Sequence, residues 1–297
     1  MIRVGGLPIA IGRFEPSTFH ILKKTSLFIF INDSFEAEEN ASLLVSDLSI
    51  QRGYGVFDFF RTINNKPVHL DDHLDRFFFS ASKMRLPIGK TREQLKEIIS
   101  ELMQKNNIPD SGIRITLTGG YSSDGYSVSK PNLIISQKPL IINDDVVNTI
   151  KLVSYAHQRQ LPDVKSIDYM MAIWLKPFVE QNSADDLLYH TGGSVTESPR
   201  SNFFIVTADD KIVTPSNNIL KGINRKYVTA IANKHFAFEE RDITLDEAYN
   251  AKEAFLTSTT KLVLPVVKID DKTIGNGEAG KFSLFIRQLL KELISQD

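Results

Sequence analysis

Apolar and polar positions alternate along the first half of the chain in patterns typical of both strands and helices. Runs rich in β-branched and aromatic residues predict strands, and stretches with apolar residues every three or four positions predict helices. Strands are expected at residues 27–32, 112–120 and 132–140, with a hairpin over 57–70 that turns at Asn64-Asn65. Helices are expected at residues 70–84 and 91–107, and the second starts with a capping box, Thr91 and Gln94.

The second half shows the same two kinds of pattern with shorter strands. A strand is expected at residues 150–157, antiparallel strands at 186–198 and 202–215, and a strand, loop and strand at 253–270. A helix is expected after residue 165, kinked or ended by Pro177, and Thr244 and Glu247 form a second capping pair. The last helix begins near residue 279 and carries an apolar stripe of Phe282, Phe285, Ile286, Leu289, Leu290 and Leu293.

These elements fall into two groups separated by a polar segment. Residues 141–149, "IINDDVVNT", are charged and polar between apolar runs, which is typical of a connector. We therefore expect a small N-terminal α/β domain at 25–140 and a larger C-terminal domain at 150–297. Residues 1–24 are expected to be an N-terminal extension. The predicted fold class is mixed α/β, or α+β, in two unequal lobes.

Composition narrows the functional classes. The 297 residues carry a formal net charge of -1, and a surface that binds nucleic acid needs a clear cationic excess, so nucleic acid is an unexpected partner. The chain contains no cysteine, which excludes disulfides and thiolate metal sites. No uncharged apolar stretch reaches about 18 residues, so we expect no membrane span. The first residues lack a signal-peptide core, and a cytoplasmic protein is expected.

One glycine motif resembles part of a dinucleotide-binding site. "GNGEAG" at 275–280 matches the spaced glycines of a dinucleotide-binding turn. That turn needs a following helix and a second strand, with an acidic residue about 20 positions on. Only one helix can follow Gly280 before the chain ends. We therefore interpret the motif as an ordinary turn and reject a nicotinamide-dependent oxidoreductase.

Four features of the second half fit the chemistry of pyridoxal phosphate. Lys165 enters an apolar, aromatic stretch, where burial would depress its pKa and favour attack on an aldehyde. Glu197 lies beside a strand that is predicted to belong to the core. A carboxylate among apolar neighbours needs a charged or hydrogen-bonding partner there. Gly222 precedes a helix whose free amides can hold an anion. Hydroxyl groups that can donate to a phosphate follow at the end of another strand, in Ser258, Thr259 and Thr260.

The order of these motifs resembles the class IV aminotransferases. "VKSIDYM", "VTESPRSNFFIV", "ILKGINR" and "AFLTSTTKLVLPV" follow one another as in that family, and "GYGVFDFFRT" with "HLDDHLDRF" resembles its N-terminal signature. The resemblance covers about residues 27–290. It implies a two-domain fold like that of D-amino-acid aminotransferase, pyridoxal 5'-phosphate as cofactor, and a homodimer whose site includes a loop of the partner chain.

The resemblance also implies roles for individual residues. Lys165 would be the Schiff-base lysine and proton shuttle, and Glu197 would pair with the pyridine nitrogen. Tyr169 would line the site near the ring. The phosphate would be held by Arg61, by the backbone amides of Ile223 and Asn224 beside Gly222, and by the hydroxyl groups of Thr259 and Ser258. The sequence departs from the usual family pattern at Gly119, Asp168, Pro199 and Asn224.

The substrates implied are an amino acid and a 2-oxo acid. An amino-acid carboxylate is best bound by a guanidinium group, and Arg52 and Arg114 are the candidates, with Tyr54 and Thr260 beside them. Two such arginines, with "SDLSIQRGYG" and "LTGGYSSDGY", resemble a less usual D-amino-acid transaminase branch. We therefore expect a D-amino acid, such as D-alanine or D-glutamate, as amino donor.

Three alternatives stay open. A branched-chain L-amino-acid aminotransferase would need an apolar pocket, which Tyr54, Phe59 and Trp174 could form. An aminodeoxychorismate lyase would share the cofactor site and a similar loop after Gly120, but would release pyruvate without transferring an amine. A non-enzymatic α/β binding domain would lack the lysine-bound cofactor.

Overall fold

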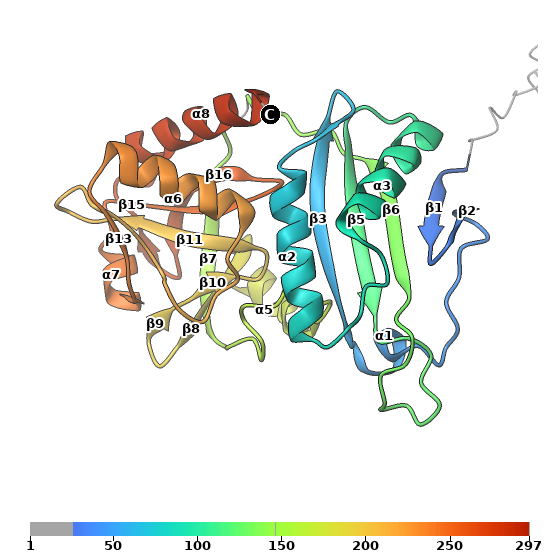
Figure 1. Cartoon of the computed structure of the whole chain (residues 1–297). Coiled ribbons are helices and arrows are strands. Elements are labelled where there is room, and N and C mark those ends of the chain that lie inside the picture. The colour runs from blue at the N-terminus through green and yellow to red at the C-terminus, as the bar shows by residue number, and fades with distance from the viewer. Residues whose placement is uncertain (1–25, 146, 297) are drawn as a thin grey trace, which may run out of the picture.

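The computed structural model describes residues 26–145 and 147–296, and the expected extension at 1–24 lies outside the described residues. The chain forms two lobes that lie side by side, each built on its own β-sheet (Figure 1). This arrangement of sheets and helices confirms the expected mixed α/β fold class.

The first lobe is a six-stranded sheet in the order β2-β1-β6-β5-β3-β4. Its neighbouring strands are all antiparallel. The strands are β1 (Phe28–Ile31), β2 (Ser34–Ala37), β3 (Gly55–Ile63), β4 (Lys66–Pro67), β5 (Ser111–Thr118) and β6 (Leu133–Pro139). The predicted hairpin is present as β3 and β4. Asn64 and Asn65 form its turn with φ of 49° and 62°, the left-handed conformation that a two-residue hairpin turn needs.

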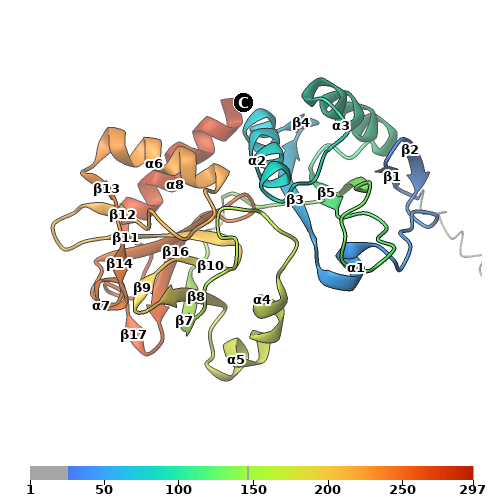
Figure 2. The same ribbon diagram turned by 60° about the horizontal axis from the view of Figure 1, so that its bottom comes forward.

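Two long helices cover one face of this sheet. They are α2 (Leu70–Lys83) and α3 (Arg92–Asn106), and a short helix, α1 (Leu48–Arg52), precedes β3. Leu74 and Phe77 of α2 and Leu95 and Ile99 of α3 pack with Phe60 of β3 in one buried core. The predicted capping box of Thr91 and Gln94 is present at the start of α3. In both views α2 lies at the boundary with the second lobe (Figure 1, Figure 2).

The second lobe is a larger mixed sheet in the order β13-β12-β11-β15-β16-β7-β8-β9-β14. Two further strands, β10 and β17, pair with β11 and β16. The strands are β7 (Ile150–Ala156), β8 (Asp186–Thr191), β9 (Ser194–Val195), β10 (Glu197–Ser198), β11 (Ser201–Val206), β12 (Ile212–Thr214), β13 (Phe238–Glu240), β14 (Ile243–Thr244), β15 (Glu253–Ser258), β16 (Leu262–Ile269) and β17 (Lys272–Thr273). β11 and β15 are almost completely buried, so this sheet is the centre of the lobe.

The second lobe also contains helices that pack around its sheet. They are α4 (Met170–Trp174), α5 (Lys176–Gln181), α6 (Ile223–His235), α7 (Leu245–Tyr249) and α8 (Lys281–Gln296). The predicted helix after Lys165 is divided into α4 and α5, and Pro177 stands in the first turn of α5, where a missing N–H is tolerated. Phe282, Ile286 and Leu290 of the predicted stripe on α8 are buried with Val228 of α6.

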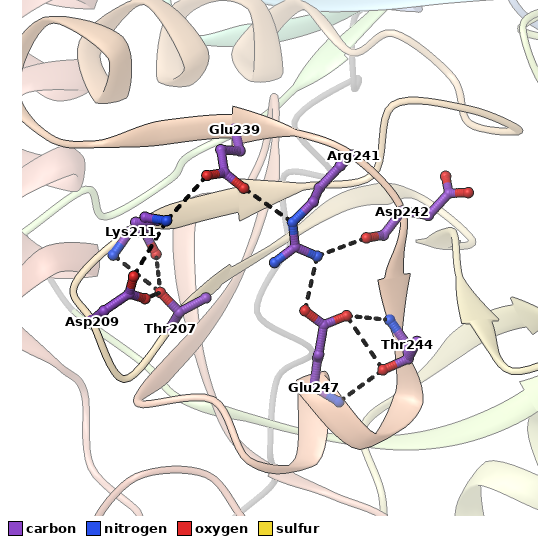
Figure 3. A network of polar contacts seen from close by, with 8 residues as sticks. All are labelled: Thr207, Asp209, Lys211, Glu239, Arg241, Asp242, Thr244 and Glu247. Carbon is purple, nitrogen blue, oxygen red and sulfur yellow. Dashed lines mark hydrogen bonds and ion pairs between the residues drawn. The ribbon is translucent and has the colours of Figure 1, made fainter.

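The capping pair of Thr244 and Glu247 is also present, at the start of α7. Glu247 N–H donates to Thr244 Oγ1 at 3.1 Å, and Thr244 N–H donates to Glu247 Oε2 at 3.0 Å. Figure 3 shows that Arg241 joins this pair to Glu239, with 2.8 Å from Nη1 to Glu247 Oε1. Within residues 26–145 and 147–296, no helix combines the length and apolar character that a membrane span needs.

Candidate active site

A cavity of about 450 Å³ lies where the two lobes meet. Side chains of both lobes line it, and most are polar or charged. They are Phe57, Phe59, Arg76, Arg114, Arg159, Lys165, Ile167, Tyr169, Glu197, Pro199, Arg200, Ser201, Asn202, Leu220, Gly222, Ile223, Asn224, Arg225, Thr257, Ser258, Thr259 and Thr260. Ten of the thirteen site residues expected from the sequence are in this set, and Arg61, Arg52 and Tyr54 are not.

The backbone of Lys165 is fixed to the first lobe although its sequence belongs to the second. Its N–H donates to Ser80 Oγ of α2 at 3.1 Å, and its carbonyl accepts from Phe57 N–H of β3 at 2.9 Å. Two residues later, Ile167 N–H donates to the Gly55 carbonyl at 3.1 Å. The segment thus runs along the start of β3 and carries the lysine side chain into the cavity between the lobes.

The amino group of Lys165 has the properties of a nucleophile and proton carrier. Its Nζ lies 4.7 Å from the centre of the Phe57 ring. The residue as a whole is half-buried because it opens onto the cavity, but burial of the amino group lowers the pKa of Lys165 to about 7. The positive charges of Arg76 and Arg159 act in the same direction, while Asp58 and Glu197 oppose them. A sizeable fraction of this amine is therefore unprotonated near neutral pH.

Glu197 is held in the cavity wall by an arginine that sequence reasoning missed. Arg159 Nε donates to Glu197 Oε1 at 2.8 Å, and Leu220 N–H donates to Oε2 at 3.0 Å. Burial raises the pKa of Glu197 above its usual value, although Arg159 and the Leu220 amide favour the charged form. Arg159 also donates to the Val164 carbonyl at 3.1 Å, next to Lys165. One guanidinium therefore orients both the carboxylate and the lysine segment.

The start of α6 forms an anion-binding cradle. Gly222 is its N-cap residue, and no side chain caps the first turn. The amides of Ile223 and Asn224 are thus available where the positive end of the helix dipole meets the cavity. A Cβ on Gly222 would lie 2.2 Å from Asn202 Oδ1, so only glycine fits.

Two buried hydroxyl groups face the same region without a partner among the described residues. Ser201 Oγ and Ser258 Oγ are both buried and accept or donate no hydrogen bond there, although both residues line the cavity. A buried hydroxyl group without a partner is unfavourable, and each of these two could donate a hydrogen bond to an anion in the cavity. Thr259 and Thr260, both expected from the sequence, extend this row of hydroxyl groups from the end of β15.

Arg76 of α2 supplies the cation on this side of the cavity. It is fixed by Asp58 of β3, with Nε to Oδ2 and Nη2 to Oδ1 distances of 2.8 Å each. His73 Nδ1 lies 2.7 Å from the same carboxylate, which is completely buried. Burial alone would raise the pKa of Asp58, but Arg76 and His73 outweigh it and keep the carboxylate charged. An aspartate inside the apolar run "VFDFF" was the sequence signal for this arginine, because such a charge requires a cationic partner.

The expectation that Arg61 contacts the phosphate is corrected by its position. Arg61 Nη1 pairs with Asp144 Oδ2 at 2.8 Å, in the segment that joins the lobes. Side chains on one face of a strand advance by about 7 Å for every two residues. Arg61 follows Phe59 on the same face of β3 and therefore lies beyond the cavity. Arg76, in "HLDDHLDRF", lines the cavity and Arg61 does not.

Arg114 and Arg200 line the cavity without an acidic partner in the described part of the chain. The Arg114 guanidinium lies 3.8 Å from the centre of the Phe57 ring, and its Nε donates to Thr116 Oγ1 at 3.3 Å. Arg200 follows Pro199 in the loop after Glu197 and was not expected from the sequence. Tyr169 lies nearby, and burial raises its pKa against the opposing charges of these arginines. Two unpaired guanidinium groups make this part of the cavity suitable for carboxylates.

Arg52 and Tyr54 line a neighbouring cavity instead. That cavity has about 540 Å³ and shares Arg159, Tyr169 and Pro199 with the first. Arg52 is exposed at the end of α1, and Tyr54 OH donates to the Met84 carbonyl at 2.7 Å. Of the apolar residues considered for a branched-chain pocket, Phe59 lines the first cavity, whereas Trp174 is 65% exposed on α4.

The residues of the cavity fit pyridoxal phosphate. Arg76, the cradle at Gly222 and the unpartnered hydroxyl groups of Ser201 and Ser258 provide donors for a phosphate dianion. The buried Glu197 suits a protonated ring nitrogen, and Lys165 suits an aldehyde. The donors come from both lobes, so the cofactor would lie at their boundary.

Comparison with known proteins also points to an enzyme that uses pyridoxal phosphate. Residues 55–269 match the family described as amino-transferase class IV. The chain is 31% identical to a D-alanine aminotransferase of Staphylococcus haemolyticus, over 85% of this chain and 92% of the relative. It is 29% identical to a putative branched-chain-amino-acid aminotransferase of Methanocaldococcus jannaschii, over 89% and 96%.

A solved structure shares the fold over nearly the whole chain. It is a branched-chain amino acid aminotransferase from T.th. complexed with N-(5'-phosphopyridoxyl)-L-glutamate, with a TM-score of 0.83 and 25% identity. The similarity covers 91% of this chain and 95% of that one. The family match over most of the chain, together with the lysine, carboxylate and phosphate donors in the cavity, shows that the protein belongs to the class IV aminotransferases, which use pyridoxal phosphate.

Proposed function

We propose that this aminotransferase takes the amino group of a D-amino acid, such as D-alanine or D-glutamate, and passes it to a 2-oxo acid. The observation that carries the proposal is the pair of arginines, Arg114 and Arg200, that line the cavity of Lys165 without acidic partners among the described residues. Relatives named D-alanine aminotransferase, at 27–31% identity, support the choice of stereochemistry.

The two arginines suit substrates with one or two carboxylates. A guanidinium group binds a carboxylate through two parallel hydrogen bonds, which fixes its orientation as well as its charge. Arg114 is already placed by the Phe57 ring and by Thr116, so its guanidinium is oriented before substrate binds. Arg200 would then be available for a second carboxylate, as in D-glutamate or its 2-oxo acid.

Pyridoxal phosphate supplies an aldehyde that bonds to amines and a ring that withdraws electrons from the substrate carbon. Lys165 Nζ would accept the α-proton as a base and return it as an acid, a role for which a pKa of about 7 is well suited. Glu197 would hold a proton on the ring nitrogen. Arg76, the amides of Ile223 and Asn224, and the hydroxyl groups of Ser258 and Thr259 would hold the phosphate.

We propose further that the active form is a cytoplasmic homodimer in which Arg52 acts in the partner's cavity. Arg52 is exposed and does not line the cavity of its own Lys165. It stands on a rigid protrusion, because the buried Asp47 accepts hydrogen bonds from Ser49 N–H, Thr118 Oγ1 and Asn132 Nδ2, each 2.7 Å long. Leu44, Val45 and Ile50 leave this protrusion with a strongly exposed apolar surface.

Mixed dimers test this arrangement. Lys165→Ala and Arg52→Ala chains should each be inactive or weak alone. If Arg52 acts across the interface, a dimer of one chain of each kind contains one complete site out of two. Random pairing makes about half of the dimers mixed, so mixing equal amounts restores about a quarter of the wild-type activity. If Arg52 acts in its own chain, mixing restores nothing. Light scattering should give a mass near twice 33.5 kDa, and a mass of one chain would contradict the dimer.

A screen of amino donors tests the reaction and its stereochemistry. The purified protein, loaded with pyridoxal phosphate, is incubated with each enantiomer of alanine, glutamate and leucine and with a 2-oxo acid, and the chirality of the product is measured. We expect transfer from D-alanine and D-glutamate. Transfer from L-leucine alone would favour the branched-chain alternative. Aminodeoxychorismate is added as a separate substrate, and release of pyruvate from it without amino transfer would favour the lyase.

A further inference from the structure

One face of α2 carries three residues that make contacts in or near the active site. Asp72, Arg76 and Ser80 are spaced by four residues, so they lie one above another along the helix. Ser80 accepts the N–H of Lys165, and Arg76 lines the cavity where the phosphate would lie. Asp72 contacts neither the cavity nor Lys165. Its partners are on α6, the helix whose start forms the anion cradle.

The contact of Asp72 with α6 crosses the boundary between the lobes. Asp72 Oδ1 accepts from Lys226 Nζ at 2.6 Å, and Oδ2 accepts from Tyr227 OH at 2.6 Å. The side chain of Asp72 is 17% exposed. Burial alone would raise the pKa of Asp72, but the bonds from Lys226 and Tyr227 lower it below its usual value. Both oxygens of the carboxylate are therefore engaged, and the ion pair is partly protected from solvent.

The partners of Asp72 lie one helical turn from the cradle. Lys226 N–H donates to the Gly222 carbonyl at 3.0 Å, which is the first hydrogen bond of α6. The amides of Ile223 and Asn224 are thus rigidly connected to Lys226 and Tyr227. On the other side, Asp72 and Arg76 are separated by one turn of α2. The contact of Asp72 with α6 therefore helps to fix the distance between the cradle amides and the Arg76 guanidinium, together with the His69 ring, which stacks on Tyr227 with 3.9 Å between the ring centres.

We propose that Asp72 is a positioning residue for the cofactor phosphate: by binding Lys226 and Tyr227, it holds the Arg76 side of the phosphate site against the amide side, which belongs to the other lobe. A phosphate that must be reached from two lobes is sensitive to their spacing, because hydrogen bonds weaken when donors move by a few tenths of an ångström. The inference concerns cofactor binding, so it is independent of which amino acid is the donor.

A matched pair of variants tests the role of Asp72. Asp72→Asn removes the charge that bridges the lobes. Asp71→Asn removes the same charge from the preceding residue, whose partners Lys96 and Arg92 both belong to the first lobe. For each variant, the dissociation constant of pyridoxal phosphate is compared with that of pyridoxal, which has the aldehyde and ring but no phosphate.

We expect Asp72→Asn to weaken pyridoxal phosphate binding about fivefold, less than loss of a direct charged hydrogen bond would, because Asp72 acts on the phosphate only through the position of its donors. Pyridoxal binding should change by less than about twofold. Asp71→Asn should change neither constant by more than about twofold. Equal weakening of both ligands, or the same loss in Asp71→Asn, would show a general effect on the fold and overturn the proposal. Unchanged binding of pyridoxal phosphate by Asp72→Asn would also overturn it.

A second variant keeps the test valid if Asp72→Asn folds poorly. Lys226 is 62% exposed at its side chain, so Lys226→Met should fold normally. It should weaken pyridoxal phosphate binding by a smaller factor than Asp72→Asn, because Tyr227 still holds Asp72. The double variant should be no weaker than Asp72→Asn alone, since both changes remove one contact. Fully additive losses would show that Lys226 acts separately from Asp72.

Discussion

Arg76 holds the carboxylate of Asp58 with two hydrogen bonds of 2.8 Å each, inside the core of the first lobe. A buried carboxylate of this kind is stable only with its cation in place, and removing one partner of a buried ion pair is strongly destabilising. We expect Asp58→Asn to lower the free energy of unfolding by about 3 kcal/mol, as measured by urea denaturation of the cofactor-free protein.

The pH dependence of stability provides a control for this prediction. The pKa of Asp58 is lowered in the folded protein, so its contribution is complete above the unfolded value of about 4 and is lost as the pH falls below it. The loss in Asp58→Asn should therefore shrink below about pH 4. The double variant Asp58→Asn with Arg76→Met should recover part of the stability. A double variant as unstable as the sum of its single changes would contradict the pairing.

Arg76 and Arg61 should differ sharply in their effects on the cofactor. Arg76→Gln removes a cation from the cavity and should weaken pyridoxal phosphate binding about 30-fold, as expected for loss of a charged hydrogen bond of about 2 kcal/mol. Arg61→Gln should change that binding by less than about twofold and instead lower stability, because Arg61 pairs with Asp144. Titration of the cofactor-free protein with pyridoxal phosphate measures the affinity of both variants, and urea denaturation measures their stability. A larger loss of affinity in Arg61→Gln would restore the sequence-based assignment.

The contrast between these arginines shows what the sequence could and could not provide. Lys165, Glu197 and the start of α6 were found because each has a local chemical signature: a cation, a carboxylate or a glycine in an apolar setting. Arg61 and Arg76 have similar local signatures, and only their long-range partners separate them. Asp144 is 83 positions from Arg61, and Asp58 is 18 positions from Arg76. Which cation reaches the cavity depends on how the two lobes meet.

The separation of partners along the chain also explains which other features could be predicted from the sequence. The capping boxes at Thr91 and Thr244 depend on residues three positions apart, so the sequence was sufficient to predict them. Arg159 pairs with Glu197 across 38 positions and was missed. Arg52, expected from the sequence to bind substrate beside Arg114, lies at the end of α1 and outside the cavity of its own Lys165.

Arg114 and Arg200 should affect substrates rather than the cofactor. Arg114→Gln should raise the KM for D-alanine about 30-fold with a smaller change in kcat, because it removes a charged bond to the carboxylate. Arg200→Gln should raise the KM for D-glutamate more than that for D-alanine. Steady-state kinetics with both donors measure this. If both variants affect the two donors equally, Arg200 does not distinguish the second carboxylate.

The capping pair in Figure 3 should contribute to the stability of the second lobe. Thr244→Ala removes the side-chain oxygen that accepts from Glu247 N–H and should lower the free energy of unfolding by about 1 kcal/mol. Thr244→Ser keeps that oxygen and serves as the control, with stability close to wild type. Thermal unfolding measures both changes. A loss in Thr244→Ser equal to that in Thr244→Ala would show that the methyl group, and not the cap, is responsible.

Lys165 should react with the cofactor as an amine of which about half is unprotonated at pH 7. Only the free amine attacks an aldehyde, and burial lowers the pKa of Lys165 to about 7. The rate at which the cofactor-free protein attaches pyridoxal phosphate, fixed with borohydride at timed intervals, should rise about 50-fold from pH 5 to pH 7 and less than about threefold above it. Lys165→Ala should attach none, and Lys83→Arg, on exposed α2 surface, should keep the wild-type profile. An amine with an ordinary pKa would continue to gain rate up to about pH 10.

The lowered pKa of Lys165 should also make the free energy of unfolding of the cofactor-free protein rise with pH. Between about pH 7 and pH 10 the unfolded chain binds a proton at Lys165 that the folded chain does not, so the free energy of unfolding rises with pH over that window. For the cofactor-free protein this term should amount to about 2 kcal/mol between pH 7 and pH 9. Lys165→Met has no such group and should lack the rise, and urea denaturation at the two pH values measures the difference. An equal rise in wild type and Lys165→Met would place the titrating group elsewhere, and an ordinary amine would then have to be assumed at position 165.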